Sequence, residues 1–198
     1  MSKRIWPQLG AASGILYVAL LFGPSLVGGD IAGYIELIGI LFLVPFLAYL
    51  WSILREAEGE GGWLSATIFG AGLVDLTIKL GSAAPSVAAE QLQERTPLDA
   101  ALHDMNSASF IISMLPLSVL TAAFAIVTLK TRVLPRWLGW LGAITAPALL
   151  VNGMALDAEY GPAFLLFLLW TVATSVVLIR RAGARSRQAA HPQPAPAH

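Results

Sequence analysis

The sequence predicts an all-α polytopic membrane protein, a bundle of six transmembrane helices, and three observations support that prediction. Hydrophobic residues make up 57% of the 198 residues and only 12% are charged, which is about half the charged fraction of a typical soluble domain. The apolar residues gather in runs of roughly 20, the length that a helix needs to cross the hydrocarbon layer. The connections between these runs alternate between those that hold nearly all of the Lys and Arg residues and those that hold almost none, as expected when consecutive helices cross a membrane in opposite directions.

The predicted spans follow the apolar runs in chain order. They cover approximately residues 9–27, 31–54, 63–83, 107–129, 137–156 and 162–179. One set of connections carries nearly all of the basic residues, which are Lys3, Arg4, Arg55, Lys130, Arg132, Arg136, Arg180, Arg181, Arg185 and Arg187. Because cytoplasmic connections are enriched in Lys and Arg, we expect both termini in the cytoplasm and the protein in the inner membrane, with the lipid bilayer as its surroundings.

The two ends of the chain need separate interpretations. Residues 1–29 resemble a signal peptide in their basic start and apolar run, but the run continues to Gly23 without a polar break, so we expect a retained first helix. Residues 182–198 are rich in Pro and Ala and are predicted to form a disordered cytoplasmic tail. Residues 1–181 then form one transmembrane domain.

A charged pair interrupts the third span. Asp75 and Lys79 stand in the run G-L-V-D-L-T-I-K-L-G-S of residues 72–82, and their spacing puts them on one helix face with the acid before the base, the favourable order. Charged side chains inside membranes almost always point into the bundle, so we expect the same of this pair. The large residues of the opposite face are predicted to meet lipid; they are Phe69, Leu73, Leu76 and Leu80.

Other spans carry polar side chains at a similar depth. Glu36 lies in the second span between Gly33 and Gly39, which predicts a packed face, and Asn152 lies near the outer end of the fifth span. The fourth helix is predicted to begin outside the membrane at T-P-L-D, residues 96–99, with Thr as N-cap and Pro at the first helical position. His103 and Asn106 follow on one face of that helix.

Together these polar residues predict an outward-facing pocket that binds a small-molecule ligand or a proton. Prolines at positions 45, 116 and 147 are placed to bend three of the helices and leave room between them. A short amphipathic helix over residues 85–95 is expected to cover the opening.

Three functions are consistent with this arrangement. The first is binding or proton-coupled transport of a small solute, with Glu36, Asp75 and Lys79 as its titratable groups; six helices make a small transporter, so a homodimer is expected. The second is an intramembrane enzyme acting on a lipid-like substrate, with Asp99 and His103 as an acid–base pair. The third is a structural or regulatory subunit in which the ion pair only fixes helix packing.

Several site types have no support in the sequence. The chain has no cysteine, and the spacing of His103 and its acidic neighbours matches no metal-ligand motif, so no metal and no cofactor are predicted. There is no phosphate-binding loop, no dinucleotide motif and no basic aromatic surface for nucleic acid. The G-x-x-x-G of Gly10 and Gly14 predicts close helix packing, either within the chain or between two copies.

The second half of the chain resembles a known family. The resemblance rests on F-I-I-S-M-L-P-L at 110–117, P-R-W-L-G-W at 135–140 and L-L-W-T-V-A-T-S-V at 168–176, and it covers mainly residues 100–180. The family consists of small bacterial integral membrane proteins with six helices and is a domain of unknown function. The resemblance implies the fold and a bacterial membrane, and it implies no site residues.

Overall fold

Helices make up nearly all of the computed structural model, which describes residues 6–27, 32–90, 97–155 and 161–190. The helices are α1 (Trp6–Val27), α2 (Ala32–Leu41), α3 (Leu43–Glu58), α4 (Trp63–Glu90), α5 (Pro97–Thr131), α6 (Arg136–Met154) and α7 (Pro162–Ala190). With α2 and α3 taken as one segment, 6 helical segments are long and apolar enough to cross a membrane. The described ranges contain no strand. The predicted all-α fold with six spans is therefore confirmed, and the chain is a multi-pass membrane protein.

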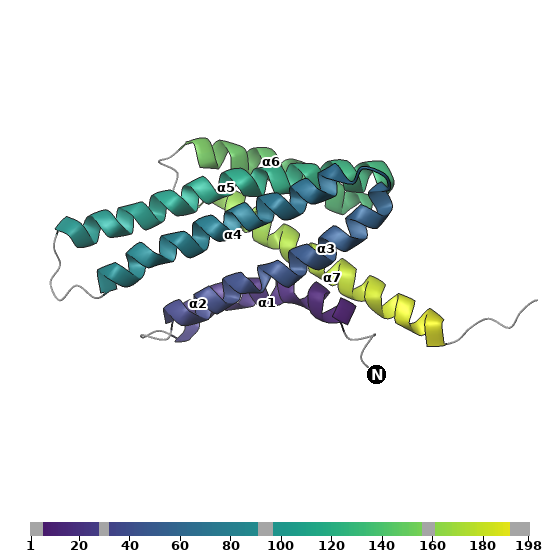
Figure 1. Ribbon diagram of the computed structural model, residues 1–198, viewed down its shortest axis with the longest axis horizontal. Coiled ribbons are helices and arrows are strands. Elements are labelled where there is room, and N and C mark those ends of the chain that lie inside the picture. The colour runs from purple at the N-terminus through teal and green to yellow at the C-terminus, as the bar shows by residue number, and fades with distance from the viewer. Residues whose placement is uncertain (1–5, 28–31, 91–96, 156–160, 191–198) are drawn as a thin grey trace, which may run out of the picture.

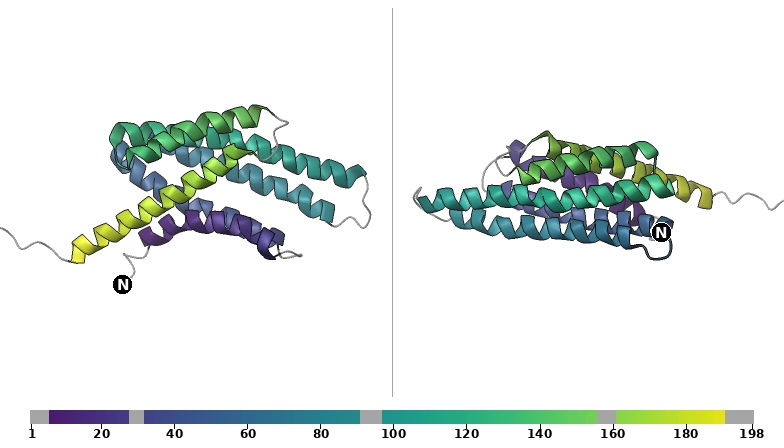
Figure 2. Two further views of the ribbon diagram at one scale, coloured as in Figure 1. Left: turned by 180° about the vertical axis from the view of Figure 1, so that it is seen from behind. Right: turned by 90° about the horizontal axis from the view of Figure 1, so that it is seen from above.

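The helices form two groups that α7 joins. In one group α5 packs along both α4 and α6, and in the other α1 packs against α2 and α3 (Figure 1). Helix α7 runs obliquely across the bundle and contacts α6 as well as α1 (Figure 2). On the other side α3 contacts α4. The bundle interior lies between the two groups, and the buried polar side chains discussed below lie there.

Basic side chains gather at one end of the bundle. The beginning of α1 and the end of α7 lie there, together with the α3–α4 and α5–α6 connections, on the right in Figure 1. The exposed basic residues at this end are Arg55, Lys130, Arg132, Arg136 and Arg180. We call it the basic end. The last residues of α1, α4 and α6 lie at the opposite end.

The second span is interrupted at Phe42, between α2 and α3. Pro45 has no N–H with which to reach the carbonyl of Leu41, four residues earlier, so one helical hydrogen bond is missing. Beside this gap, the Phe42 N–H donates to the carbonyl of Gly39, three residues earlier, at 3.0 Å, which is the tighter pairing of a 3₁₀ turn. The interruption of the helix therefore falls one turn before Pro45, for which the sequence predicted a bend.

Two helices extend farther than the sequence predicts. Helix α4 continues through Pro85 to Glu90, so the described part of the segment 85–95 continues α4 and is not a separate surface helix; its remainder lies outside the described residues. Helix α7 continues to Ala190, past the predicted start of a disordered tail at residue 182. Ala, Arg and Gln dominate this stretch and are strong helix formers, which explains the continuation.

Helix α5 has 35 residues and is therefore about 52 Å long at 1.5 Å per residue. The hydrocarbon layer is only about 30 Å thick, so α5 protrudes from the membrane. It begins at Pro97, as the T-P-L-D motif predicts. The residues at its start lie at the end of the bundle opposite the basic end.

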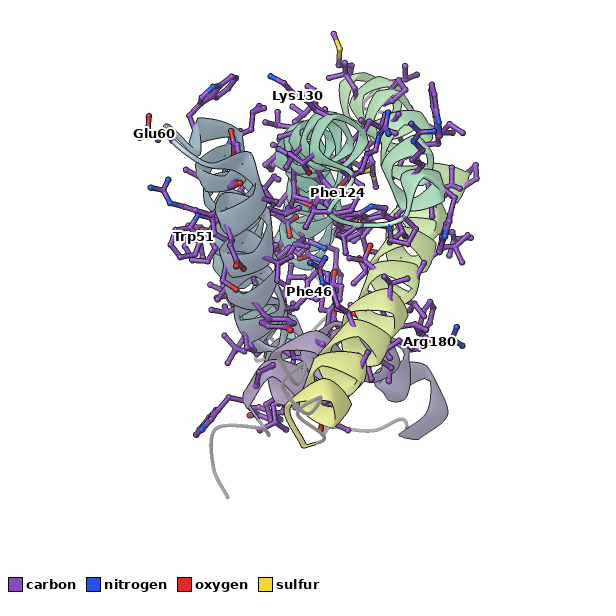
Figure 3. The ribbon with its side chains drawn as sticks, turned by 90° about the vertical axis from the view of Figure 1, so that its right-hand side faces the viewer. Phe46, Trp51, Glu60, Phe124, Lys130 and Arg180 are labelled. Atoms are coloured by element: carbon purple, nitrogen blue, oxygen red, sulfur yellow. The ribbon has the colours of Figure 1, made fainter. Side chains whose placement is uncertain are left out.

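Aromatic rings fill the interior. Trp170 of α7 is fully buried and makes edge-on contacts with Phe46 of α3 and Phe124 of α5, with ring centroids 6.4 and 4.8 Å apart. Figure 3 shows Phe46 and Phe124 pointing into the space between the helix groups, whereas Trp51 projects outward. These contacts join three helices that are distant in sequence.

The G-x-x-x-G pair of α1 serves packing within the chain. A Cβ atom on Gly10 would lie 2.8 Å from the Cβ of Tyr49 in α3. One on Gly14 would collide with Ser175 of α7 and Phe46 of α3. Of the two roles that the sequence left open for this motif, the structure assigns it internal packing.

Candidate functional site

Helix α4 carries its charged pair into the bundle interior. The exposed fractions of Asp75 and Lys79 are 0% and 6%, and Lys79 Nζ lies 3.9 Å from Asp75 Oδ1. The residues are one helical turn apart and so project from the same face. The pair points inward, as its position in an apolar span indicates.

The lipid-facing surface of α4, on the side opposite the ion pair, is narrower than the sequence suggested. Leu73 and Leu80 are exposed, as expected for residues that meet lipid, and Phe69 is half-buried. Leu76, however, is buried, which corrects the prediction for that residue. It follows Asp75 directly, and α4 is covered by α5 on one side and by α3 on the other, so the packed surface of the helix is broader than the stripe of small residues.

Three other helices reach the Lys79 ammonium. The hydroxyl of Tyr17 in α1, which is fully buried, accepts a hydrogen bond from Nζ at 3.4 Å. Nζ also lies 5.3 Å from the ring centroid of Phe110 in α5 and 4.7 Å from that of Phe164 in α7. Such cation–π contacts are strongest where water is excluded. The ammonium group of Lys79, which belongs to α4, therefore contacts residues of α1, α5 and α7.

The Asp75 carboxylate has a poorer environment. Neither of its oxygens has a hydrogen-bond partner among the described residues, which leaves the ion-pair contact with Lys79. Ser113 of α5 lies close enough to influence the carboxylate, but its hydroxyl donates to the Phe110 carbonyl at 2.7 Å. A buried polar group without its hydrogen bond costs about 1–3 kcal/mol, and more when it is charged.

Glu36 lies on the bundle surface, contrary to the packed face that its neighbouring glycines suggested. Its side chain is exposed, as are those of Tyr34 and Ile38 on the same helix. Helix α2 contacts α4, and the charge of Glu36 is close enough to act on Lys79 and on Tyr17. Glu36 therefore belongs to the electrostatic surroundings of the pair while remaining accessible from outside.

The other predicted polar residues lie farther along the bundle. Asn152 of α6 is half-buried, and its Nδ2 donates to Met114 Sδ of α5, the residue after Ser113. Asn106 is half-buried and His103 is exposed; His103 precedes Ser113 by about 15 Å along α5 at 1.5 Å per residue. The structure thus brings Asp75 and Lys79 together. Glu36 lies on α2, which contacts α4, Asn152 lies on α6, which packs against α5 and α7, and His103 lies nearer the start of α5.

One proposal from the sequence lies outside these contacts. The side chain of Asp99 lies outside the described part of the structure, so an Asp99–His103 pair is not defined. Among the described residues no group of three His, Asp or Glu side chains is placed to hold a metal ion.

Of the grooves on the bundle surface, two are well defined among the described residues, and the ion pair lines neither. One of about 550 Å³ lies between α5 and α6. The other, of about 500 Å³, lies between α6 and α7 and includes Asn152 in an otherwise mostly apolar lining. Asp75 and Lys79 are enclosed by protein, and the outward-facing polar pocket predicted around them stays a prediction.

Sequence reasoning missed Tyr17, Phe110 and Phe164, which complete the surroundings of the ion pair. Phe110 and Phe164 give no sequence signal, because aromatic residues are ordinary in apolar spans. Tyr17 does give one. Tyrosines of membrane proteins concentrate at the two interfaces, whereas Tyr17 follows Trp6 by about 16 Å along α1 and lies near the middle of its span.

Comparison with known families finds one match. The family described as "Domain of unknown function (DUF4386)" matches residues 61–181, which is more than half of the chain and includes all of the described contacts of α4 with α5 and α7. The match begins well before residue 100, where the resemblance noted from the sequence becomes strong. No curated protein and no solved structure in the comparisons matches the chain.

Proposed function

Because this chain belongs to the DUF4386 family, a domain of unknown function, we propose a function from the site alone. The protein binds a proton at the Asp75–Lys79 pair and couples this to the binding or transport of a small solute across a bacterial inner membrane. The observation that carries the proposal is that Asp75 is fully buried and accepts no hydrogen bond from a described residue, because the Lys79 ammonium is 3.9 Å away and the nearby Ser113 hydroxyl donates to the Phe110 carbonyl.

Stabilisation of helix packing does not by itself account for a buried ion pair at this position. Desolvation of two charges offsets most of their attraction, and apolar replacements of a buried pair are often equally stable or more so. Hydrogen bonds between membrane helices contribute only about 0.6 kcal/mol on average. A carboxylate that changes its protonation state, in contrast, needs to be free of the fixed donors that would hold it permanently ionised.

The contacts of Lys79 provide a physical basis for coupling. Protonation of Asp75 would remove the ionic partner of Lys79, whose ammonium also contacts Tyr17 of α1, Phe110 of α5 and Phe164 of α7. A change in its position therefore alters the packing of α4 against three helices. Access of solvent to the pair would require a rearrangement of the helices that enclose it.

Glu36 offers a route for protons. It is exposed on α2, and its charge acts on the buried Lys79. The titratable groups around the pair, within the described residues, are Tyr17, Glu36, Asp75 and Lys79. In the open state Asn106 and Asn152 would line the path of the solute, with His103 nearer its mouth. The basic end then faces the cytoplasm, in accord with the positive-inside rule.

A ligand screen at two pH values tests this function. Purified protein is heated with a panel of amines, carboxylic acids and amino acids, and compounds that raise the unfolding temperature at only one pH are kept. In proteoliposomes such a compound should carry protons into the lumen, as measured with an enclosed pH-sensitive dye. Asp75→Asn and Glu36→Gln should abolish both effects, and Glu56→Gln, which changes an exposed carboxylate near the basic end, should abolish neither.

The opposite result would assign the pair to structure. If Asp75→Asn combined with Lys79→Met keeps the pH-dependent ligand response of the unchanged protein, the pair only fixes helix packing. In that case the function resides elsewhere in the bundle.

A further inference from the structure

A second feature, separate from the ion pair, lies between α5 and α6 on the outer surface of the bundle. The groove there has a volume of about 550 Å³, within the range of about 300–1,000 Å³ that is typical of small-molecule pockets. Its lining includes small residues of both helices, namely Ala122 and Ala125 of α5 and Ala143 and Ala146 of α6. Val119 and Ile126 border it and are 48% and 51% exposed, so the groove opens toward the lipid.

The length of the groove indicates what occupies it. On α5 it extends from Ser118 to Leu129, which corresponds to about 16 Å at 1.5 Å per residue. This is roughly half of the hydrocarbon thickness of about 30 Å, and hence the depth of one leaflet. A transmembrane helix of a second copy would contact the bundle over both leaflets. An acyl chain extends over only one.

The groove ends where the basic residues begin. Lys130 directly follows Leu129, and Arg132 and Arg136 follow in the connection to α6; all three are exposed. Figure 3 shows Lys130 projecting away from the bundle at this end. The chain contains no Asp or Glu from residue 105 to residue 156, so the α5–α6 hairpin has no acidic residue of its own to neutralise these charges. The first turn of α6 adds the positive end of its dipole.

We propose that the α5–α6 groove binds one acyl chain of an anionic phospholipid whose phosphate is held by Lys130 and Arg136. The apolar lining accommodates the chain, and each basic side chain near an anionic lipid surface contributes about 1 kcal/mol. The lipid would cover the small residues and fix the position of α6 against α5. This site does not depend on protonation of the ion pair.

A single-cysteine experiment tests the proposal directly, because the natural chain contains no cysteine. Ala122→Cys is a small change within the groove, and Leu169→Cys places the same group on α7 at a position that is 56% exposed. Each variant is labelled with a fluorophore and titrated in micelles with phosphatidylglycerol or phosphatidylcholine that carries bromine in its acyl chains. Phosphatidylglycerol should quench the label at Ala122→Cys at a much lower mole fraction than the label at Leu169→Cys, and phosphatidylcholine should show no such preference.

The headgroup contacts are tested in the Ala122→Cys background. Lys130→Gln with Arg136→Gln should raise the phosphatidylglycerol needed for half-maximal quenching about 30-fold, which corresponds to the loss of two contributions of about 1 kcal/mol each. Arg180→Gln, an exposed basic residue of α7, should leave it unchanged.

Three results would overturn the proposal. Equal quenching at the two cysteine positions would show that lipid has no preference for the groove. An equal loss with Arg180→Gln would show a general effect of surface charge. Efficient cross-linking between two copies at Ala122→Cys would show that the groove holds a helix of a second copy.

Discussion

Two carboxylates, those of Glu58 and Asp75, interact with α4, and they differ in the number of hydrogen bonds that they accept. Glu58, at the end of α3, accepts hydrogen bonds from the N–H groups of Leu64 and Ser65, at 3.1 and 2.9 Å, and from the Ser65 hydroxyl at 2.6 Å. Asp75, three turns farther along α4, accepts no hydrogen bond from any described residue. One carboxylate is fully matched with donors. The other has an ammonium 3.9 Å away and a nearby Ser113 hydroxyl that donates to the Phe110 carbonyl.

The hydrogen bonds of Glu58 are those expected of a carboxylate with a structural role. Glu58 satisfies free N–H groups at the beginning of a helix and interacts favourably with the positive end of its dipole. Burial opposes the ionised form, but the hydrogen bonds from Ser65 and Leu64 and the charge of Arg55 together outweigh it. Asp75 accepts no hydrogen bond from a described residue, although it lies in the bundle interior, where a charge without hydrogen bonds is most unfavourable. We therefore assign a fixed structural role to Glu58 and a variable protonation state to Asp75.

The largest effect is expected from removing one charge of the buried pair. Lys79→Met should lower the free energy of unfolding by about 3–5 kcal/mol, because it leaves a buried carboxylate without a partner. Denaturant titration in detergent micelles measures this loss. Adding Asp75→Asn should restore stability to within about 1 kcal/mol of the unchanged protein, since the isolated charge is removed as well. A double variant as unstable as Lys79→Met would contradict this account.

A smaller effect is expected at Glu58. Glu58→Ala removes the acceptor for the first N–H groups of α4 and should cost about 0.5–2 kcal/mol, the range found for helix caps. The pH-dependent ligand response should remain. The matched change is Glu56→Ala in the same helix, where the side chain is exposed and the expected change is within about 0.5 kcal/mol. Loss of the ligand response in Glu58→Ala would remove the distinction between the two carboxylates.

The smallest effect on stability is expected at Tyr17. Tyr17→Phe removes the hydroxyl that accepts from Lys79 at 3.4 Å and should cost about 0.5–1.5 kcal/mol, again measured by denaturant titration. Its effect on function should be larger, because the charge environment of Lys79 changes. We expect the pH midpoint of the ligand response to move in Tyr17→Phe and to stay in place in Tyr49→Phe, a tyrosine of α3 outside the pair.

The sequence was sufficient for the fold because the membrane restricts the choices. Apolar runs of sufficient length have to be helices, and Pro97 marks the start of α5 correctly. The sequence also indicated that Asp75 and Lys79 point inward, since a charged face of a spanning helix has few alternatives. The length of α7 was not predictable from hydropathy, because its last turns lie beyond the apolar run.

The site was harder to predict because it depends on contacts between helices. Glycines beside Glu36 suggested a packed face, but of these Gly39 alone meets α1 closely, with a Cβ at that position 2.7 Å from Leu20 Cβ. Glu36 itself projects outward. Similarly, no pattern within α5 or α7 shows that Phe110 and Phe164 meet over Lys79. These relations follow from the crossing of α7, which a single sequence does not encode in any local motif.

Infrared difference spectroscopy of the whole protein in lipid tests the central assignment most directly. Spectra recorded over a range of pH should contain a carboxyl band that gains intensity as Asp75 takes up a proton, and this band should be missing in Asp75→Asn and present in Glu58→Gln. A spectrum in which Asp75→Asn removes no pH-dependent band would show that this carboxylate keeps one protonation state, and would contradict the account.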